Sequence, residues 1–90
     1  MIFKVVLIKH DHCAVLRKML GLTQKDIATL VGTTKMSISN FERFGTGSEP
    51  LRRVIGYVMF NLLKDLTLSD EVKDYIADEF FYTKEKELGV

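Results

Sequence analysis

The sequence predicts a mainly α-helical bundle of about five helices with an N-terminal β-strand, centred on a helix-turn-helix. Three observations support this fold class. A chain of 90 residues with 47% hydrophobic residues is enough for one small globular domain with a single core. Apolar residues recur at helical spacing along most of the chain, whereas the segment 1–9 is rich in β-branched and aromatic types. Two short helical segments flank the turn Gly-Thr-Thr at 32–34, which is typical of a helix-turn-helix.

The first segment, MIFKVVLIK at 1–9, predicts a β-strand. A lone strand leaves its backbone groups unpaired, so this one needs a partner. One alternative is the segment 80–83 near the C-terminus, and the other is the same strand of a second subunit, which gives a twofold dimer. The edge-strand argument favours the dimer, and residues 1–10 are therefore assigned to an N-terminal strand with a dimerisation role.

The first helix is expected over 12–20, with Asp11 as its N-cap and Gly21 at its C-terminal end. Its apolar stripe consists of Val15, Leu16, Met19 and Leu20. This stripe is expected to face the core.

The next two helices are expected over 24–31 and 35–44. Thr23 and Thr34 precede them, and a threonine hydroxyl in that position accepts a hydrogen bond from a first-turn amide. Gly32 lies between the helices, where the chain leaving the first one needs a residue that tolerates positive φ.

A fourth helix is expected over 51–66, capped by Ser48 or Glu49, and a fifth begins after Ser69. The residues of the fifth helix that are expected to face inward are Val72, Ile76, Phe80 and Tyr75. The polar tail 84–90 is expected to fray.

Charge is unevenly distributed along the chain. Residues 1–53 hold nine Lys/Arg and four acidic residues, a net +5, whereas residues 54–90 hold four and eight, a net −4. A basic half that contains the helix-turn-helix suits a polyanionic partner, although an ordinary charged surface gives the same pattern. The longest uncharged apolar stretch, 54–63, is far short of the roughly 20 residues of a membrane span. No membrane association is expected, and segment 1–8 lacks a signal-peptide cleavage site, so a cytoplasmic location is expected.

The stretch 21–42, GLTQKDIATLVGTTKMSISNFE, resembles the helix-turn-helix of phage lambda-type repressors and bacterial Xre-type regulators. The matching positions are Arg17, Gly21, Leu22, Thr23, Gln24, Ala28, Gly32, Thr34, Ile38, Phe41 and Glu42. The resemblance implies a lambda repressor-like fold, with a DNA-binding domain over 11–66 and a C-terminal helix and tail, 67–90, packed on it. It also implies a sequence-specific transcriptional regulator, a repressor, that binds an inverted-repeat operator in double-stranded DNA as a homodimer.

The resemblance further assigns roles to individual residues, with a recognition helix over 35–43 in the major groove. It implies that Lys35, Met36, Ser39 and Asn40 read bases, and that Gln24, Thr34, Ser37, Arg43 and Thr46 contact phosphates. Lysine can donate to guanine O6 and N7, asparagine can bind adenine N6 and N7, and an apolar side chain can contact the thymine methyl group. Arg17 and Glu42 are implied to form a structural ion pair that joins the first helix to the third.

The run ERFGTGSEP departs from the family pattern, because Phe44 is inserted before Gly45 and an acidic residue precedes Pro50. Backbone contacts from this loop are therefore less secure. Arg52 and Arg53 are candidates to replace them, although a solvated helix face is the plainer interpretation.

Two other classes of function remain. The same fold can serve as the antitoxin of a toxin–antitoxin pair or as another protein-interaction module, with the acidic C-terminal helix docking on a protein partner. Enzyme activity is not expected, because the cluster His10, Asp11, His12 and Cys13 has no oxyanion or phosphate loop beside it. These residues also fall short of a zinc quartet, so neither a metal nor a cofactor is expected, and Cys13 is expected to be a buried thiol.

Overall fold

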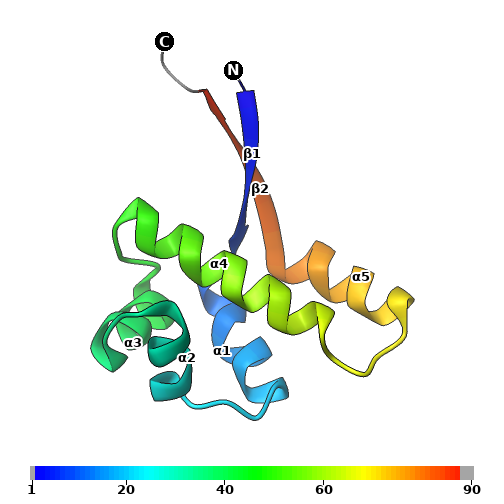
Figure 1. The fold of residues 1–90 in the computed structure, drawn as a ribbon, viewed down its shortest axis with the longest axis horizontal. Coiled ribbons are helices and arrows are strands. Elements are labelled where there is room, and N and C mark those ends of the chain that lie inside the picture. Colours follow the sequence, from blue (N-terminus) through cyan, green and yellow to red (C-terminus); the bar gives the residue numbers. More distant parts are fainter. Residues whose placement is uncertain (1, 88–90) are drawn as a thin grey trace.

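The computed structural model describes residues 2–87, which form a helical body with a two-stranded ribbon projecting from it (Figure 1). The described residues are mainly helical, with five α-helices. In chain order the elements are β1 (Ile2–Ile8), α1 (His10–Met19), α2 (Gln24–Val31), α3 (Lys35–Phe44), α4 (Glu49–Lys64), α5 (Asp70–Phe80) and β2 (Phe81–Glu87). Among residues 2–87, no helix has the length and apolar character needed to cross a membrane.

Strand β1 pairs antiparallel with β2, in a register that runs from Ile2 opposite Glu87 to Ile8 opposite Phe81. The prediction that β1 finds its partner in a second copy, rather than in this chain's C-terminal segment, is therefore wrong for this edge of the strand. The tail prediction is also wrong for 84–87, which is strand, and 88–90 lie outside the described residues. Lys4 lies opposite Glu85, and such an opposite-charge pair stabilises an exposed ribbon.

Helix α4 packs directly against the backbone of β1, and Gly56 makes this contact possible. A Cβ atom at Gly56 would lie 2.7 Å from the carbonyl oxygen of Val6 and 3.0 Å from Cα of Leu7. No side chain fits there without a shift of the backbone, so the glycine lets the strand and the helix approach closely.

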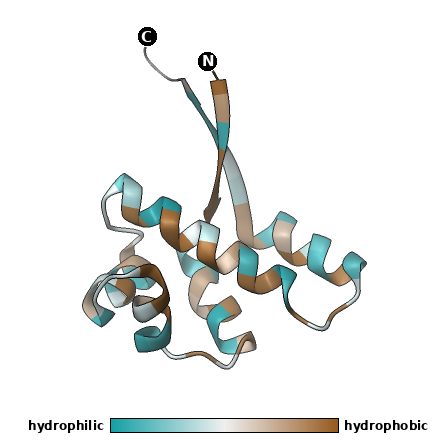
Figure 2. Cartoon of the chain, in the orientation of Figure 1, coloured by the Kyte–Doolittle hydropathy of each residue, from teal (hydrophilic) through white to brown (hydrophobic). Residues whose placement is uncertain are grey.

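The buried core joins the ribbon base to all five helices. Figure 2 shows hydrophobic residues on the inner part of β1 and along α4. The buried apolar residues are Ile8, Cys13, Leu16, Ile27, Ala28, Ile38, Phe41, Ile55, Met59, Leu63, Ile76 and Phe81. Burial of these side chains supplies the main stabilisation of the fold, and it fixes α1, α2 and α3 relative to one another.

Helix α1 begins earlier than predicted, and Asp11 is not its N-cap. The N-cap residue is Lys9, which makes no side-chain cap, and Asp11 accepts a hydrogen bond from His12 Nδ1 at 3.0 Å. The backbone N–H of Lys9 donates to Phe80 O at 2.8 Å and so continues the β1–β2 ladder. Lys9 therefore belongs both to the end of the strand pairing and to the start of α1, and no separate residue between them caps the helix.

Two predicted apolar faces are partly wrong. On α1, Leu16 is buried as expected, but Cys13 shares its face, and Val15 and Met19 are exposed. On α5, Ile76 is buried and Phe80 is half-buried, whereas Val72 and Tyr75 are exposed. Each of these two helices packs against the core on one side only. The helical spacing of apolar residues was therefore predicted correctly, but fewer of those residues are buried than expected.

The remaining helices agree with the prediction closely. Thr23 caps α2, Thr34 caps α3 and Ser48 caps α4, whereas α4 begins at Glu49 rather than 51 and ends at Lys64 rather than 66. Ser69 caps α5 by accepting a hydrogen bond from the amide of Val72.

Candidate nucleic-acid interface

The α2–turn–α3 unit is fixed by local hydrogen bonds at each end of the turn. At the start of α2, Thr23 Oγ1 accepts from the amide of Asp26 at 3.1 Å, and Asp26 Oδ2 accepts from the amide of Thr23 at 2.9 Å. These bonds form a capping box, and they lower the pKa of Asp26. Gly32 ends α2 with φ of 84°, and Thr34 Oγ1 accepts from the amide of Ser37 at 3.1 Å to start α3. The turn therefore holds the two helices in one arrangement.

A polar network ties α1, the start of α2 and the end of α3 together. Arg17 Nε donates to Glu42 Oε2 at 2.8 Å, and Nη2 donates to Oε1 at 3.1 Å, so the expected ion pair forms and is bidentate. Arg17 Nη1 also donates to Leu22 O at 3.0 Å. Gln24 Nε2 donates to Glu42 Oε1 at 2.9 Å. The side chains of Arg17 and Glu42 are 11% and 5% exposed, so this network holds α3 from inside the domain.

Burial and hydrogen bonding act in opposite directions on Glu42. Burial raises the pKa of this carboxyl group, but the hydrogen bonds from Arg17 and Gln24 and the positive charge of Arg17 outweigh it, so its pKa is lowered overall. Beside it, burial and the Glu42 charge raise the pKa of the Cys13 thiol to about 12. Cys13 is therefore a neutral, buried core residue, as expected.

The N-terminal half of α3 presents the predicted base-reading residues on the outside of the domain. Lys35 is exposed, Met36 is 68% exposed, and Ser39 and Asn40 are half-buried. Met36, Asn40 and Arg43 follow the spacing i, i+4 and i+7, which places them in one stripe along the helix. A large exposed apolar side chain such as Met36 within a polar stripe is consistent with a contact surface.

The predicted phosphate ligands are less uniform. The Thr34 hydroxyl donates to Ser37 Oγ at 2.9 Å, so these two side chains lie side by side at the start of α3. The Thr46 hydroxyl donates to Asn40 O at 3.4 Å, which brings the loop after α3 against that helix. Gln24 gives one amide N–H to Glu42, and its amide nitrogen carries a second N–H. The structure thus places Gln24 in the scaffold as well as at the surface.

A shallow hollow separates the N-terminal ends of α2 and α3. It is lined by Arg17, Leu22, Thr23, Gln24, Lys25 and Lys35. Lys25 from α2 and Lys35 from α3 both line this hollow, so two basic residues from different helices meet there. Sequence reasoning missed Lys25, although its position next to Gln24 at the start of α2 was a usable signal.

The loop after α3 and the start of α4 do not extend the stripe in the expected way. Phe44 is exposed at the end of α3. Arg53 lies over the ring of Phe3, 5.8 Å from its centroid, and its Nη2 is 3.4 Å from Glu49 Oε1. Arg53 is therefore directed to the ribbon, so the expectation that it replaces the loop's contacts to a phosphate backbone is not supported.

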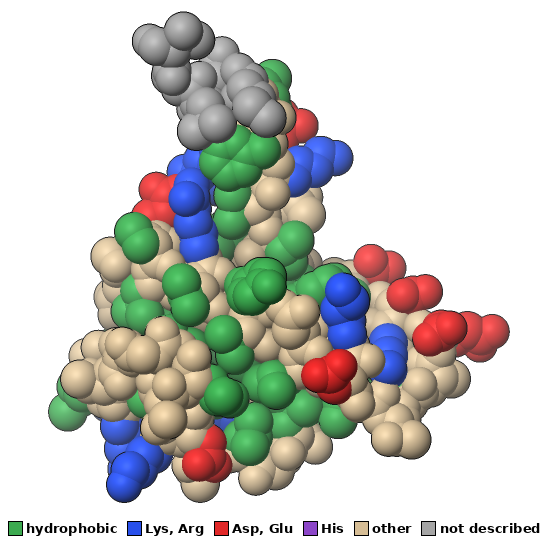
Figure 3. Space-filling view, viewed as in Figure 1, with side chains coloured by type: hydrophobic (Ala, Val, Ile, Leu, Met, Phe, Trp, Pro, Cys, Tyr) green, Lys and Arg blue, Asp and Glu red, His purple; other side chains and the backbone are tan. Residues whose placement is uncertain are grey.

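The acidic residues of α5 lie away from this surface, whereas the exposed Asp26 lies in the first turn of α2. Figure 3 shows red carboxylate side chains along the end of the molecule formed by α5, while basic side chains lie at the opposite lower edge, below α2 and α3. The acidic residues of α5 are Asp70, Glu71, Asp74, Asp78 and Glu79. The excess of acidic residues in the second half of the sequence is therefore gathered mainly on α5.

Comparisons with protein-family models, with curated proteins and with solved structures give no significant match to this chain.

Proposed function

We propose that this chain is a sequence-specific DNA-binding transcriptional regulator of the lambda repressor-like, Xre type, a repressor that inserts α3 into the major groove. The observation that carries this proposal is the outward-facing stripe of Met36, Asn40 and Arg43, with Lys35 beside it. An α-helix fits the major groove, and side chains near its N-terminus reach base edges when the helix is held by a second one.

The residue types in the stripe divide the contacts into two kinds. Asn40 can form two hydrogen bonds to adenine N6 and N7, Lys35 can donate to guanine O6 or N7, and Met36 can contact a thymine methyl group. Lys25 and Arg43 carry charges that neutralise phosphates, which increases affinity for every sequence but does not select among sequences.

The scaffold beneath the stripe supports the same proposal. Direct readout requires a helix held at one angle, because a bidentate contact is lost when the side chain is displaced by about 1 Å. The pair of Arg17 with Glu42 and the hydrogen bond from Gln24 hold both ends of the α2–α3 unit. A polar network at this depth is costly unless it is satisfied, and here each partner is engaged.

The test begins with selection of bound duplexes from a random pool at low salt. On the selected site we expect Asn40→Ala to cost roughly 1–3 kcal/mol, through lost discrimination at one base pair. Arg43→Ala should weaken binding to all sequences alike. Lys73→Ala on α5 is the matched control for loss of a positive charge, and it should leave binding unchanged. If Asn40→Ala reduces affinity equally for every duplex, its reader role is wrong.

A homodimer on an inverted repeat is part of this proposal. The two recognition helices would then contact half-sites whose centres lie about 34 Å apart, one turn of DNA. Footprinting of the selected site measures this spacing. A single protected half-site with no symmetry-related second one would argue for a monomeric binder.

A protein-interaction role is the second candidate, and the exposed side of α5 favours it. Val72 and Tyr75 are exposed there amid acidic residues, and an apolar stripe with charged margins suits a partner protein. Coexpression with the product of an adjacent gene, followed by copurification, distinguishes this role from DNA binding alone. The toxin–antitoxin alternative predicts the same copurification. In that case Val72→Asp would abolish copurification without changing DNA binding.

A further inference from the structure

Strand β1 has one edge paired with β2 and a second edge that no other strand within residues 2–87 pairs with. Hydrogen bonding alternates along an antiparallel pair. Lys9 donates to Phe80 O, so Lys9, Leu7, Val5 and Phe3 direct their backbone groups toward β2. Ile2 and Lys4, like Val6 and Ile8, therefore direct their N–H and C=O groups to the free edge.

Helix α4 covers only the inner part of this free edge. The Val6 carbonyl oxygen and the Ile8 amide nitrogen lie 2.7 Å and 3.3 Å from the position of a Cβ atom on Gly56, which agrees with the alternation deduced above. Nearer the tip of the ribbon, the backbone N–H and C=O groups of Ile2 and Lys4 lie beyond the contact with Gly56. An unpaired edge of this kind is a template for another strand.

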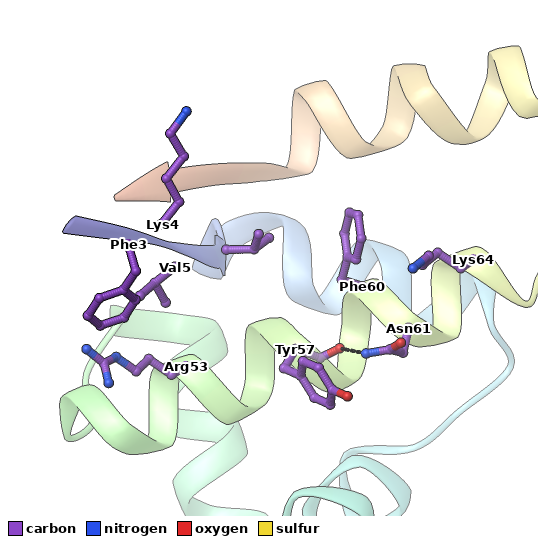
Figure 4. A pocket seen from close by; sticks show the side chains of 9 residues that line it. Phe3, Lys4, Val5, Arg53, Tyr57, Phe60, Asn61 and Lys64 are labelled. Atoms are coloured by element: carbon purple, nitrogen blue, oxygen red, sulfur yellow. Dashed lines mark hydrogen bonds between the residues drawn. The ribbon is translucent and has the colours of Figure 1, made fainter. Parts of the chain in front are cut away.

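A groove of about 500 Å³ runs beside the same edge, between β1 and α4 (Figure 4). Phe3 and Val5 point to the α4 side of β1 and Lys4 points away from it, while Tyr57 and Phe60 come from α4. Tyr57 is 70% exposed and Ile2 is 66% exposed. The edge therefore combines free backbone groups with apolar side chains that lack cover.

We propose that a second copy of this chain adds its own β1 to this edge, antiparallel and about a twofold axis at Phe3. Only one register satisfies both the backbone and the charges. With the axis at Phe3, Ile2 of each copy exchanges hydrogen bonds with Lys4 of the other, and the two Phe3 side chains meet on one face. With the axis at Lys4, the edge would need the Val6 carbonyl that α4 covers, and two ammonium groups would lie opposite each other.

This pairing produces a four-stranded sheet in the order β2, β1, β1 of the second copy and β2 of the second copy. Phe3 of each copy adds apolar surface on the α4 side of the sheet, where the groove lies. Ile2 lies on the opposite face with Lys4, which retains Glu85 of its own chain as its neighbour. The role of this dimer in DNA binding rests on the proposed function. The presence of the dimer interface itself is measured without DNA.

The first experiment uses proline to remove one edge donor. Because the Lys4 N–H faces the free edge, Lys4→Pro leaves the β1–β2 ladder intact, and edge strands tolerate proline in that position. Lys4→Thr is the matched control, since it removes the charge but keeps the N–H. By sedimentation equilibrium of the full chain, we expect Lys4→Pro to raise the dimer dissociation constant by about tenfold or more, and Lys4→Thr to leave the dimer intact.

The second experiment tests the register by disulfide formation. A non-hydrogen-bonded pair places its side chains close together, so Phe3→Cys should oxidise to a covalent dimer. Lys4→Cys is the control and should not, because Lys4 lies opposite Ile2 of the second copy. The native Cys13 is buried and does not compete. Cross-linking through Lys4→Cys but not Phe3→Cys would overturn the register.

Other outcomes decide the proposal clearly. A wild-type chain that remains monomeric at every concentration overturns it, and Lys4 then protects the edge against pairing. A dimer that Lys4→Pro leaves unchanged places the interface elsewhere and also overturns it. Binding of a single half-site duplex separates the two proposals: a Lys4→Pro monomer that binds a half-site supports the DNA role, whereas an edge dimer that binds no duplex supports the interface alone.

Discussion

The helix-turn-helix and the β-ribbon are specified by different kinds of information. Each boundary of α2 and α3 is set by residues within a few positions of it, such as Thr23, Gly32 and Thr34. The ribbon joins Ile2 to Glu87, almost the full length of the chain, and no local signal connects them. The difference teaches that the part proposed to touch DNA is organised locally, whereas the part proposed to join two copies depends on long-range packing.

The largest effect is expected from breaking the buried ion pair of the helix-turn-helix. Arg17→Ala leaves the Glu42 carboxylate buried without its counter-charge, and we expect a loss of about 3–5 kcal/mol in the free energy of unfolding. Urea denaturation at pH 7 measures it. Arg53→Ala, which removes a partly exposed ion pair with Glu49, is the control and should cost at most about 1 kcal/mol. Equal losses for the two variants would contradict the assigned difference in burial.

A smaller effect is expected where the ribbon docks. Alanine usually stabilises a helix interior relative to glycine, but at Gly56 its Cβ atom would meet the backbone of β1. We therefore expect Gly56→Ala to destabilise the fold by about 1–3 kcal/mol and to accelerate amide hydrogen exchange in β1.

Gly32→Ala serves as the comparison for this effect. Nothing lies within 4 Å of a Cβ atom at Gly32, and its cost comes from a positive φ of 84° instead, about 1–2 kcal/mol. Hydrogen exchange in β1 should then remain slow. A stabilising Gly56→Ala would show that β1 does not rest on α4.

The smallest effect is a pH dependence centred on Glu42. Because its pKa is lower in the folded state, its stabilising contribution is present above the unfolded value of about 4.3 and is lost as the pH falls through the folded pKa. Glu42→Gln resembles the protonated side chain at every pH. The stability difference between wild type and Glu42→Gln should therefore narrow as the pH falls from 7 toward 3, measured by denaturation at each pH. A difference that is constant with pH would indicate that the charge of Glu42 contributes nothing.

The sequence predicted the elements better than it predicted their partners. The threonine and serine caps and the pairing of Arg17 with Glu42 follow from local spacing or from family resemblance, and the structure contains them. The sequence offered 80–83 as one partner of β1, but the edge-strand argument favoured a second subunit, and the extension of the strand over 84–87 was missed because these residues carry alternating charges that give no hydrophobic pattern. Their pairing depends on the strand opposite and on the Gly56 contact.

The proposed site shows the same division. The exposure of Lys35 and Met36 follows from helical spacing. The convergence of Lys25 with Lys35 at one hollow depends on the angle between α2 and α3, which no local pattern reveals. The hydrogen bond from Gln24 to Glu42 likewise depends on the packing of α2 against α3 and could not be predicted from local sequence.

The central claim is that α3 and the basic residues around it bind DNA. Fluorescence anisotropy of a selected duplex over a salt series tests this most directly, because each neutralised phosphate adds to the slope of log affinity against log salt. We predict tight binding at about 50 mM salt that weakens steeply as salt rises. We also predict a slope reduced by about one for Arg43→Ala, with no change for Lys73→Ala. Absence of binding to any duplex of the pool, or binding whose affinity does not depend on salt, would contradict the account.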